Sequence, residues 1–304
     1  MEYGFVILHY MAYEMTCECV DLLLNNFGSQ KIHIVIVDNA SSNGSGAELE
    51  KRYSNIPSVT VLLNKENLGF AKGNNIGYSY LKEHFDCDFM VIMNNDVLVK
   101  DKDFLDKIPE IYTKKEFAVL GPDIYNQNSS RKHQNPFFLN GDTKDVLQKR
   151  LRQLKVNYEN YDFFYKKQIL ISKIKSLNIL AKIYRFFKYD MLKMQRIDYK
   201  KEYENPVLHG SCYIFSKLFI SAREYAFYPK TFLYYEENIL HYQCLKNNLK
   251  IFYSPEIMVY HLEDVSTNMV IKNNFEKEKF KMGKMIESLQ LFIELMEEDN
   301  VKEL

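Results

Sequence analysis

The chain has 304 residues, of which 46% are apolar and 26% are charged, as expected for one large or two small globular domains. Its formal net charge is zero, so no overall field favours nucleic acid or another strongly charged partner. The five cysteines include no CxxC pair, which argues against a disulfide framework or a zinc site and favours reduced thiols. No apolar run reaches the length of a membrane span, and the acidic start "MEYGFVILHY" predicts a strand rather than a signal peptide.

Strand and helix patterns alternate along the first 125 residues. Short apolar runs predict strands at residues 5–10, 33–39, 59–64, 89–94 and 118–124. Helical spacing of apolar residues predicts helices at residues 15–26, 47–53, 70–84 and 101–115. Continuously apolar strands that alternate with helices are typical of a sheet covered on both faces. The expected fold class is therefore α/β, with a Rossmann-like, mostly parallel mixed sheet.

The pattern changes after residue 125. Residues 144–202 carry 16 Lys and Arg against 6 Asp and Glu, a local charge of +10 that the rest of the chain balances. Apolar residues recur among the lysines at helical intervals, which predicts either an amphipathic helix packed on the core or a basic helix on an anionic membrane. The apolar positions include Ile169, Ile174, Leu177, Leu180, Ile183 and Phe187.

Strand patterns return in the later part of the chain, at residues 207–215 and 250–261. Between them, residues 232–248 predict a loop that leads into a helix, and residues 275–296 have the spacing of an amphipathic C-terminal helix. The expected organisation has four parts: an α/β part, a basic helical insert, a second α/β part and a C-terminal helix. They span residues 1–125, 126–206, 207–265 and 266–304.

Polar side chains follow four of the predicted strands. They are His9 and Tyr10, Asp38 and Asn39, Asn64 and Asn67, and Asp96. In parallel sheets, ligands bind beyond the carboxyl ends of the strands. Each ending alone is an ordinary turn, but together they predict a nucleotide-sized cleft. The chain has neither GxGxxG nor GxxxxGKS, so a P-loop is not expected to hold the phosphates.

Four residues could carry chemistry at such a cleft. Asp96 ends the stretch "VIMNND" and offers the hard oxygen that magnesium or manganese prefers; a cation there could bridge to a diphosphate. His261 also ends a strand, and an imidazole ligand would favour manganese. Glu236 and Glu237 follow the aromatic run "FLYY", which favours the raised pKa of a general base. The ordinary alternatives are a turn, a structural histidine and a solvated helix start.

The order of these pieces resembles an inverting nucleotide-sugar glycosyltransferase of family 2, with similarity to the rhamnosyltransferase-like branch that builds bacterial surface polysaccharides. The similarity covers residues 1–125 and 207–265. The motifs are "IVIVDNASSNGS" (34–45), "NKENLGFAKGNNIG" (64–77), "VIMNNDVLV" (91–99), "LGPDI" (120–124), "HGSCYIF" (209–215), "FLYYEEN" (232–238) and "YH" (260–261).

The resemblance implies the glycosyltransferase A fold and a role for individual residues. Asp96 would bind the metal, Mn²⁺ or Mg²⁺, within a DxD-type motif, and His261 would be a second metal ligand. Glu237, with Glu236 beside it, would supply the catalytic base. The donor pocket would comprise His9, Tyr10, Asp38, Asn67, Gly69, Lys72, Gly73, Asn74, Asn94 and Asn95, with Asp38 on the nucleotide base, and the acceptor side Gly210 and Ser211.

The expected function is metal-dependent, inverting transfer of a hexosyl group from a nucleotide-diphosphate sugar to a glycan acceptor in bacterial capsule or surface polysaccharide synthesis. Residues 1–125 would bind the donor, and residues 207–265 would hold the acceptor and the base. The expected location is cytoplasmic, either free or peripheral at the inner face of the membrane, where a lipid-linked acceptor would be met. Nucleic acid is not an expected partner, and a homodimer stays open.

Two alternatives remain open at this point. Relatives carry Asp and Arg where this chain has Ile239 and Gln243, which motivates a non-catalytic sugar-nucleotide-binding or scaffold relative. A sugar-phosphate nucleotidyltransferase would need a Gly-rich loop with Arg and Lys after the first strand, and "HYMAYEMT" has none.

Overall fold

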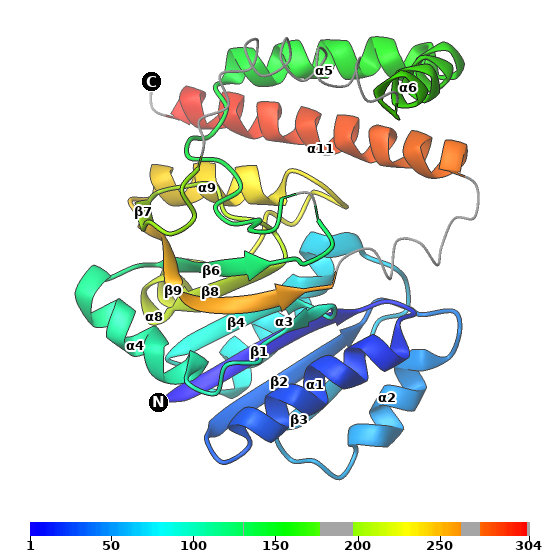
Figure 1. Ribbon diagram of the computed structural model, residues 1–304. Helices are drawn as coiled ribbons and strands as arrows, with labels where there is room; N and C mark the ends of the chain where they lie inside the picture. Colours follow the sequence, from blue (N-terminus) through cyan, green and yellow to red (C-terminus); the bar gives the residue numbers. More distant parts are fainter. Residues whose placement is uncertain (130, 177–196, 263–273, 303–304) are drawn as a thin grey trace. The chain divides into compact units, whose positions relative to one another are not determined.

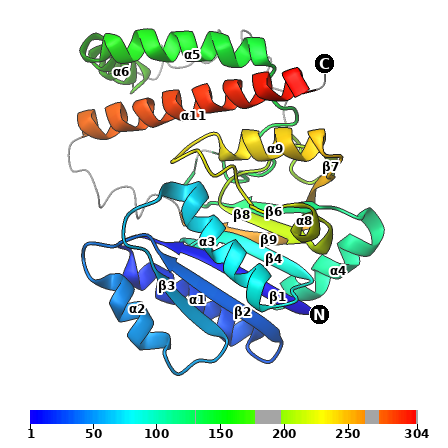
Figure 2. The same ribbon diagram turned by 180° about the vertical axis from the view of Figure 1, so that it is seen from behind.

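The computed structural model describes residues 1–129, 131–176, 197–262 and 274–302 (Figures 1 and 2). The chain forms two compact units. One comprises Met1–Asp142 and Tyr199–Val270, and the other comprises Thr143–Asp198 and Ile271–Leu304. The described strands all belong to the first unit, whereas the described part of the second is helical.

The strands of the first unit are β1 (Glu2–His9), β2 (Lys31–Asp38), β3 (Val59–Leu63), β4 (Phe89–Asn94), β5 (Val97–Leu98), β6 (Val119–Tyr125), β7 (Tyr203–Glu204), β8 (Cys212–Ser216) and β9 (Ile251–His261). Its helices are α1 (Tyr13–Phe27), α2 (Ser45–Tyr53), α3 (Gly69–His84), α4 (Phe104–Lys115), α8 (Lys217–Ala222) and α9 (Glu236–Lys246). The second unit contains α5 (Lys144–Glu159), α6 (Tyr161–Ser176) and α11 (Asn274–Lys302).

The described strands form one mixed sheet in the order β3-β2-β1-β4-β8-β6-β9-β5, with β7 paired to β9. Strands β3, β2, β1 and β4 are parallel, so their carboxyl ends meet at one edge of the sheet (Figure 1). Strand β8 is antiparallel to β4 and β6, and β5 is antiparallel to β9. The predicted α/β fold class with a mostly parallel mixed sheet is confirmed.

Helices cover both faces of this sheet because the strands are apolar on both sides. In β1, Phe5 and Ile7 belong to a cluster that includes buried residues of α1, α2 and α4. Val6, between them in sequence, belongs to a second cluster with buried residues of α3, α8 and α9. This alternation follows from the two-residue period of a strand, and it explains why the sequence shows continuous apolar runs.

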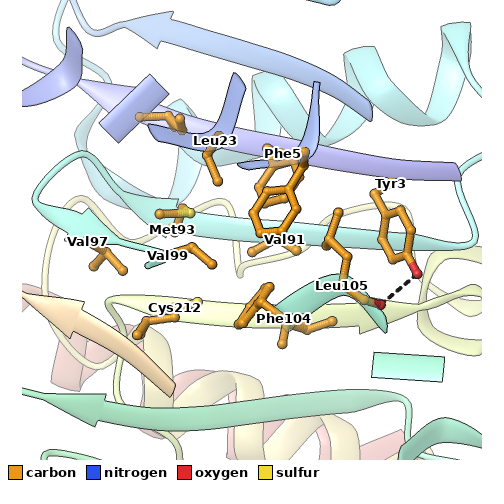
Figure 3. Close-up of a cluster of buried hydrophobic side chains, with 14 of the residues drawn as sticks. Tyr3, Phe5, Leu23, Val91, Met93, Val97, Val99, Phe104, Leu105 and Cys212 are labelled. Carbon is orange, nitrogen blue, oxygen red and sulfur yellow. Dashed lines mark hydrogen bonds between the residues drawn. The ribbon is translucent and has the colours of Figure 1, made fainter. Parts of the chain in front are cut away.

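Figure 3 shows part of the first cluster, in which side chains of β1 and β4 meet α1 and α4. Phe5 and Val91 are completely buried there, beside Leu105 of α4. Burying side chains of this size contributes roughly 1.5–3 kcal/mol each to stability. The Tyr3 hydroxyl donates a hydrogen bond to the Leu105 carbonyl oxygen at 2.9 Å, which ties α4 to the start of β1. The packed sheet thereby positions the loops at its edge.

The second unit has a small apolar core of its own. Tyr161 of α6 packs with Met282 and Ile286 of α11. An ion pair of 2.9 Å joins Lys144 Nζ at the start of α5 to Glu297 Oε1 on α11. None of the described helices has the length and hydropathy needed to span a membrane.

Three short elements were not predicted from the sequence: β5, β7 and α8. Strand β5 has only two residues, Val97 and Leu98, which is too short to show a periodic pattern. It forms because Val97 pairs with His261 at the end of β9. This pairing decides the geometry of the candidate site.

Candidate active site

Asp96 and His261 lie side by side at the edge of the sheet. Asp96 directly precedes β5, and its carbonyl oxygen accepts a hydrogen bond from the Leu262 N–H at 2.9 Å. The β5–β9 ladder therefore holds the two side chains together from both backbones. Atom Nε2 of His261 lies 3.4 Å from Oδ1 of Asp96, and both side chains are at most 10% exposed. The structure thus brings together two residues that the sequence only suggested as partners.

The contacts of His261 suit a cation site. Its Nδ1 lies 2.7 Å from Oε1 of Gln134, an oxygen that only accepts hydrogen bonds. Nδ1 is therefore the nitrogen that donates, and in the tautomer with its one proton there Nε2 presents a lone pair toward Asp96. Among the described residues, no hydrogen-bond donor reaches Oδ1 of Asp96. A lone pair facing a buried carboxylate oxygen is repulsive, so this pair is suited to hold a positive species between its two atoms, either a proton or a divalent cation.

The donor set at this point is small. Within the described ranges, no three His, Cys, Asp or Glu side chains gather as a complete metal site. One carboxylate and one imidazole still fit magnesium or manganese, which keep several waters and complete their shells with substrate phosphates. The two residues therefore fit a divalent cation that a diphosphate shares.

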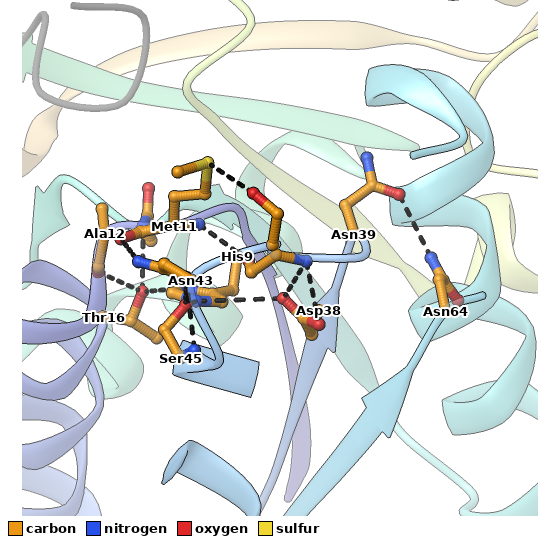
Figure 4. A network of polar contacts seen from close by, with 12 residues as sticks. His9, Met11, Ala12, Thr16, Asp38, Asn39, Asn43, Ser45 and Asn64 are labelled. Atoms are coloured by element: carbon orange, nitrogen blue, oxygen red, sulfur yellow. Dashed lines mark hydrogen bonds and ion pairs between the residues drawn. The ribbon is translucent and has the colours of Figure 1, made fainter. Parts of the chain in front are cut away.

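Asp38 lies at the end of β2 in a network of polar contacts, which Figure 4 shows. Both of its carboxylate oxygens are 3.3 Å from the Ser41 N–H. His9, at the end of β1, is completely buried behind it, with Nδ1 2.7 Å from Thr16 Oγ1 and Nε2 2.8 Å from Ser45 Oγ. Burial lowers the pKa of His9 to about 4, so the ring is neutral at physiological pH. The geometry places His9 as a support for the loops around Asp38.

Asn39 organises the loop that follows β3. Its amide nitrogen donates to Asn67 Oδ1 at 2.9 Å and to the Gly69 carbonyl oxygen at 3.1 Å. Its amide oxygen accepts from the Leu68 N–H at 3.0 Å and from Asn64 Nδ2 at 3.2 Å. One buried side chain therefore fixes the segment that carries the predicted donor-site residue Asn67, which is itself exposed.

Helix α3 begins against the segment that precedes the two glutamates. Gly69 has φ +77°, and a Cβ there would lie 2.2 Å from the Phe232 carbonyl oxygen. The Phe70 N–H donates to that same oxygen at 2.8 Å. Of the other predicted donor residues on α3, Asn74 is buried and Lys72 is exposed beside an open, mainly apolar hollow. Gly73, also on α3, packs against Leu8 of β1.

The two asparagines before Asp96 have different surroundings. The Asn94 N–H donates to the Ser211 carbonyl oxygen at 2.9 Å, which ties the end of β4 to the start of β8. Asn95 is buried, and its amide nitrogen donates to Thr16 Oγ1 at 2.9 Å. Asn94 and Tyr10 are both half-buried. Asn95 therefore fixes the backbone next to Asp96 from inside the protein.

Glu236 and Glu237 open α9, directly after Tyr234 and Tyr235, which have φ values of +75° and +67°. Glu236 is buried, and burial followed by repulsion from Glu237 raises the pKa of Glu236 to about 8. Glu237 is half-buried, and burial also raises its pKa. Its carboxylate lies against Gly210, where a Cβ would come within 2.8 Å of Oε1. A carboxylate with a raised pKa is suited to general base catalysis.

The turn His209–Ser211 connects the separate parts of the site. Gly210 contacts Glu237, and the Ser211 carbonyl accepts the hydrogen bond from Asn94. The rings of His209 and His261 lie with their centroids 5.7 Å apart. The pKa of His209 is lowered to about 3, by burial first and by the neighbouring His261 second. One turn thus touches the acidic pair, the end of β4 and the Asp96–His261 pair.

Three residues of this region were not predicted as site residues. His209 belongs to the quoted motif "HGSCYIF", so the motif itself could have indicated it. Gln134 and Asn135 lie in a loop without periodicity, and only their contacts with His261 and with the His209 N–H reveal them.

The two positions that depart from relatives do not leave unpaired groups. Ile239 is completely buried in the first turns of α9. Gln243 Oε1 accepts a hydrogen bond from Arg223 Nη2 at 2.6 Å. A guanidinium is therefore present beside position 243, supplied by Arg223 from the segment after α8.

Comparisons with known proteins agree with this architecture. A model of the family described as Glycosyl transferase family 2 matches residues 5–174, more than half of the chain. No curated protein sequence matches the chain. The solved structure of S. aureus TarS 1–349 is 14% identical with a TM-score of 0.53, over 86% of this chain and 60% of that chain.

Two further solved structures are similar. S. aureus TarS 1–349 in complex with UDP-GlcNAc is 15% identical with a TM-score of 0.54, over 87% of this chain and 59% of that one. GalNAc-T7 with UDP, GalNAc and Mn²⁺ is 12% identical with a TM-score of 0.56, over 87% and 44% respectively. The chain thus spans about 60% or less of the length of these proteins, and at such identities the likeness shows the fold.

Proposed function

Because the chain belongs to glycosyl transferase family 2 and has the glycosyltransferase A fold, we propose that it transfers a hexosyl group from a nucleoside-diphosphate sugar to an acceptor hydroxyl with inversion. The observation that carries the proposal is the His209–Ser211 turn. It contacts Glu237, the end of β4 and His261, and so joins a candidate base to a candidate cation site. Inverting transfer needs these two functions on opposite sides of the reacting carbon.

In this proposal Glu237 accepts the proton of the acceptor hydroxyl as its oxygen attacks the anomeric carbon. Glu237 is half-buried, and its carboxylate lies against Gly210, which belongs to the turn assigned to the acceptor side. Glu236 is its neighbour in the chain, and its pKa near 8, raised by burial and by repulsion from Glu237, favours the protonated form at neutral pH. Burial also raises the pKa of Glu237, in the direction that strengthens a general base.

The donor would lie along the edge formed by β1, β2, β3 and β4. Asp38 would accept hydrogen bonds from the nucleobase, and the Asn39-anchored loop carrying Asn67 would line the pocket. A divalent cation, Mn²⁺ or Mg²⁺, held by Asp96 and His261 would neutralise the charge that develops on the leaving diphosphate. Asn94, whose N–H is tied to Ser211, keeps Asp96 at this edge.

The acceptor and cellular role are proposed from the resemblance and the basic segment. We place the protein in bacterial surface polysaccharide synthesis, in the cytoplasm, with a glycan acceptor that a lipid carries. On α6, Phe163 and Leu170 are 74% and 59% exposed and flank the exposed Lys166 and Lys167. That combination supports peripheral binding to anionic lipid. Of the other predicted apolar positions, Leu177, Leu180, Ile183 and Phe187 lie outside the described residues.

Nucleotide release from a panel of nucleotide sugars in the presence of Mn²⁺ tests the transferase. UDP-sugars come first, because S. aureus TarS, which shares the fold, has been solved with UDP-GlcNAc. Glu237→Gln should bind donor and lose at least about a hundredfold in transfer, and Asp96→Ala should lose a similar factor. The control is Asp86→Asn, which changes a surface carboxylate bonded to Lys217. Donor binding without nucleotide release by wild-type protein would favour the non-catalytic alternative.

Flotation with vesicles that contain anionic lipid tests the membrane partner. The wild-type protein should float at low salt and be released at high salt, because charge attraction is screened within about 10 Å at ~0.1 M salt. Reversing the charges of Lys166 and Lys167 should weaken flotation without changing hydrolysis of soluble donor. If the wild-type protein does not bind such vesicles at low salt, an anionic membrane is not its partner.

A further inference from the structure

His261 is held by a loop that belongs neither to its own strand nor to the segments identified by the sequence motifs. This anchor loop, Arg131–Phe137, follows β6 and contains Gln134. Gln134 is 6% exposed, and its Oε1 accepts the proton on His261 Nδ1 at 2.7 Å. Because a neutral imidazole carries one proton, this contact favours the tautomer in which Nε2, the nitrogen that faces Asp96, is unprotonated.

The anchor loop is fixed to β6 close to this contact. The Gln134 N–H donates to the Ile124 carbonyl oxygen at 2.9 Å. In the preceding residue, His133 Nδ1 lies 2.8 Å from Oδ2 of Asp123, a side chain that is almost completely buried on β6. The His133 ring also stacks on Tyr199, with centroids 3.5 Å apart. Gln134 is therefore presented to His261 by a backbone held on both sides of the loop.

The residue after Gln134 continues the same arrangement. Asn135 is completely buried; its amide nitrogen donates to the Pro122 carbonyl oxygen at 2.8 Å, and its amide oxygen accepts the His209 N–H at 2.9 Å. A Cβ on Gly121 would come within 2.8 Å of that amide nitrogen, so glycine leaves the room that Asn135 occupies. Two consecutive amides of the anchor loop thus hold the two histidines of the site.

We propose that Gln134 is a positioning residue that selects the tautomer of His261 with the proton on Nδ1, so that the Nε2 lone pair is available to a divalent cation at Asp96. The inference rests on the proposed function in that it concerns the same cation site. Outer-sphere partners of this kind fix the orientation and basicity of a histidine ligand, and their loss typically weakens metal binding 10–100-fold. A glutamine facing the other way would donate to Nδ1 and turn a protonated Nε2 toward Asp96.

Three proteins test the contact. In Gln134→Met the side chain keeps its approximate size but loses the acceptor, so Mn²⁺ affinity should fall roughly 10–100-fold. In Gln134→Glu the acceptor is retained, so affinity should stay within about threefold of the wild type or rise. The matched control is Gln153→Met, which changes a glutamine on an exposed part of α5 and should leave affinity unchanged. Mn²⁺ alone is titrated against full-length protein by electron paramagnetic resonance, with thermal melting as the folding check.

The ¹⁵N shifts of the wild-type imidazoles give a readout that needs neither metal nor activity. His261, assigned by the signal lost in His261→Gln, should show a protonated Nδ1 and an unprotonated Nε2, and Gln134→Glu should show the same pattern. A wild-type ring protonated at Nε2 overturns the inference, as does unchanged Mn²⁺ affinity in folded Gln134→Met. If Gln134→Met does not fold, the wild-type and Gln134→Glu spectra decide.

The proposed function and this inference fail in different ways. Wild-type protein that binds Mn²⁺ no better than Asp96→Ala removes the cation site, whatever the tautomer of His261. A cation site that depends on Asp96 but not on Gln134 leaves the proposed function intact and removes only the positioning role.

Discussion

Gly210→Ala is the sharpest test of the place assigned to Glu237. A Cβ at Gly210 would lie 2.8 Å from Glu237 Oε1, well inside ordinary contact. The backbone at Gly210 is outside the left-handed region, so alanine is not strained by its own conformation. The atom that must move is the end of a flexible side chain, and that costs little stability. The substitution therefore displaces the candidate base without disturbing the fold.

The size of the effect follows from this distance. Restoring ordinary van der Waals separation requires the carboxylate to move by roughly half an ångström, and a misplacement of about 1 Å can cost about a hundredfold in rate. We therefore expect a loss of roughly tenfold to a hundredfold in kcat for transfer, with the KM for donor unchanged. Stability should change by less than about 1 kcal/mol, since replacing glycine also reduces the entropy of the unfolded chain.

Steady-state kinetics measure kcat and KM for transfer, and thermal melting of the same preparations measures stability. Gly283→Ala is the matched control, because the nearest atom to its Cβ would be 3.5 Å away and no catalytic role is assigned there. Wild-type transfer rates in Gly210→Ala would refute the assignment of Glu237 as the base at this position. A large fall in melting temperature would instead show that the turn is a structural element.

Three further outcomes are expected. Asn39→Ala should lower the free energy of unfolding by about 1–3 kcal/mol and weaken donor binding, because it removes the hydrogen bonds that hold the loop after β3. Urea unfolding measures the first effect and nucleotide titration the second; unchanged donor affinity would contradict the role of the loop. Gly69→Ala should destabilise the folded protein by about 3 kcal/mol, because φ at this position is +77° and the new Cβ would lie 2.2 Å from the Phe232 carbonyl oxygen. Thermal melting measures the loss, and a melting temperature equal to that of the wild type would be inconsistent with this backbone. The pKa of His9 is near 4 in the folded protein and 6.5 in the unfolded chain, so between these pH values the unfolded state binds more protons. The free energy of unfolding should therefore fall by up to about 3 kcal/mol as the pH drops from 6.5 toward 4. His9→Gln should lack this pH-dependent loss of stability, and equal pH profiles for the two proteins would argue against a neutral buried ring.

The sequence by itself determined the layers of the first unit. A strand covered on both faces must be apolar at successive positions, and a helix on such a sheet must be apolar at every third or fourth. The sequences of β1, β2, β4, α1 and α3 meet these local requirements, so the α/β fold class could be predicted from the spacing of their apolar residues. Asp38 and Asp96 were found for the same reason, because they mark the points where apolar strands end.

The tertiary structure decided which of the strand-end residues meet. Asp96 and His261 face each other because the two-residue strand β5 pairs with the end of β9. A strand of two residues is too short to show a periodic pattern in the sequence. The tertiary structure also places Arg223 beside Gln243, one of the two positions that depart from relatives, and so supplies a guanidinium there.

The parts of the site that the sequence could not supply are those made by irregular chain. Gln134 and Asn135 act through hydrogen bonds to His261 and to the backbone of His209, residues far away in the sequence. Loop residues have no burial period of their own, because their backbone follows whichever distant groups satisfy their donors and acceptors. Repeated burial in strands and helices leaves a local pattern, whereas a single long-range hydrogen bond leaves none, and so only the folded chain revealed the anchor loop.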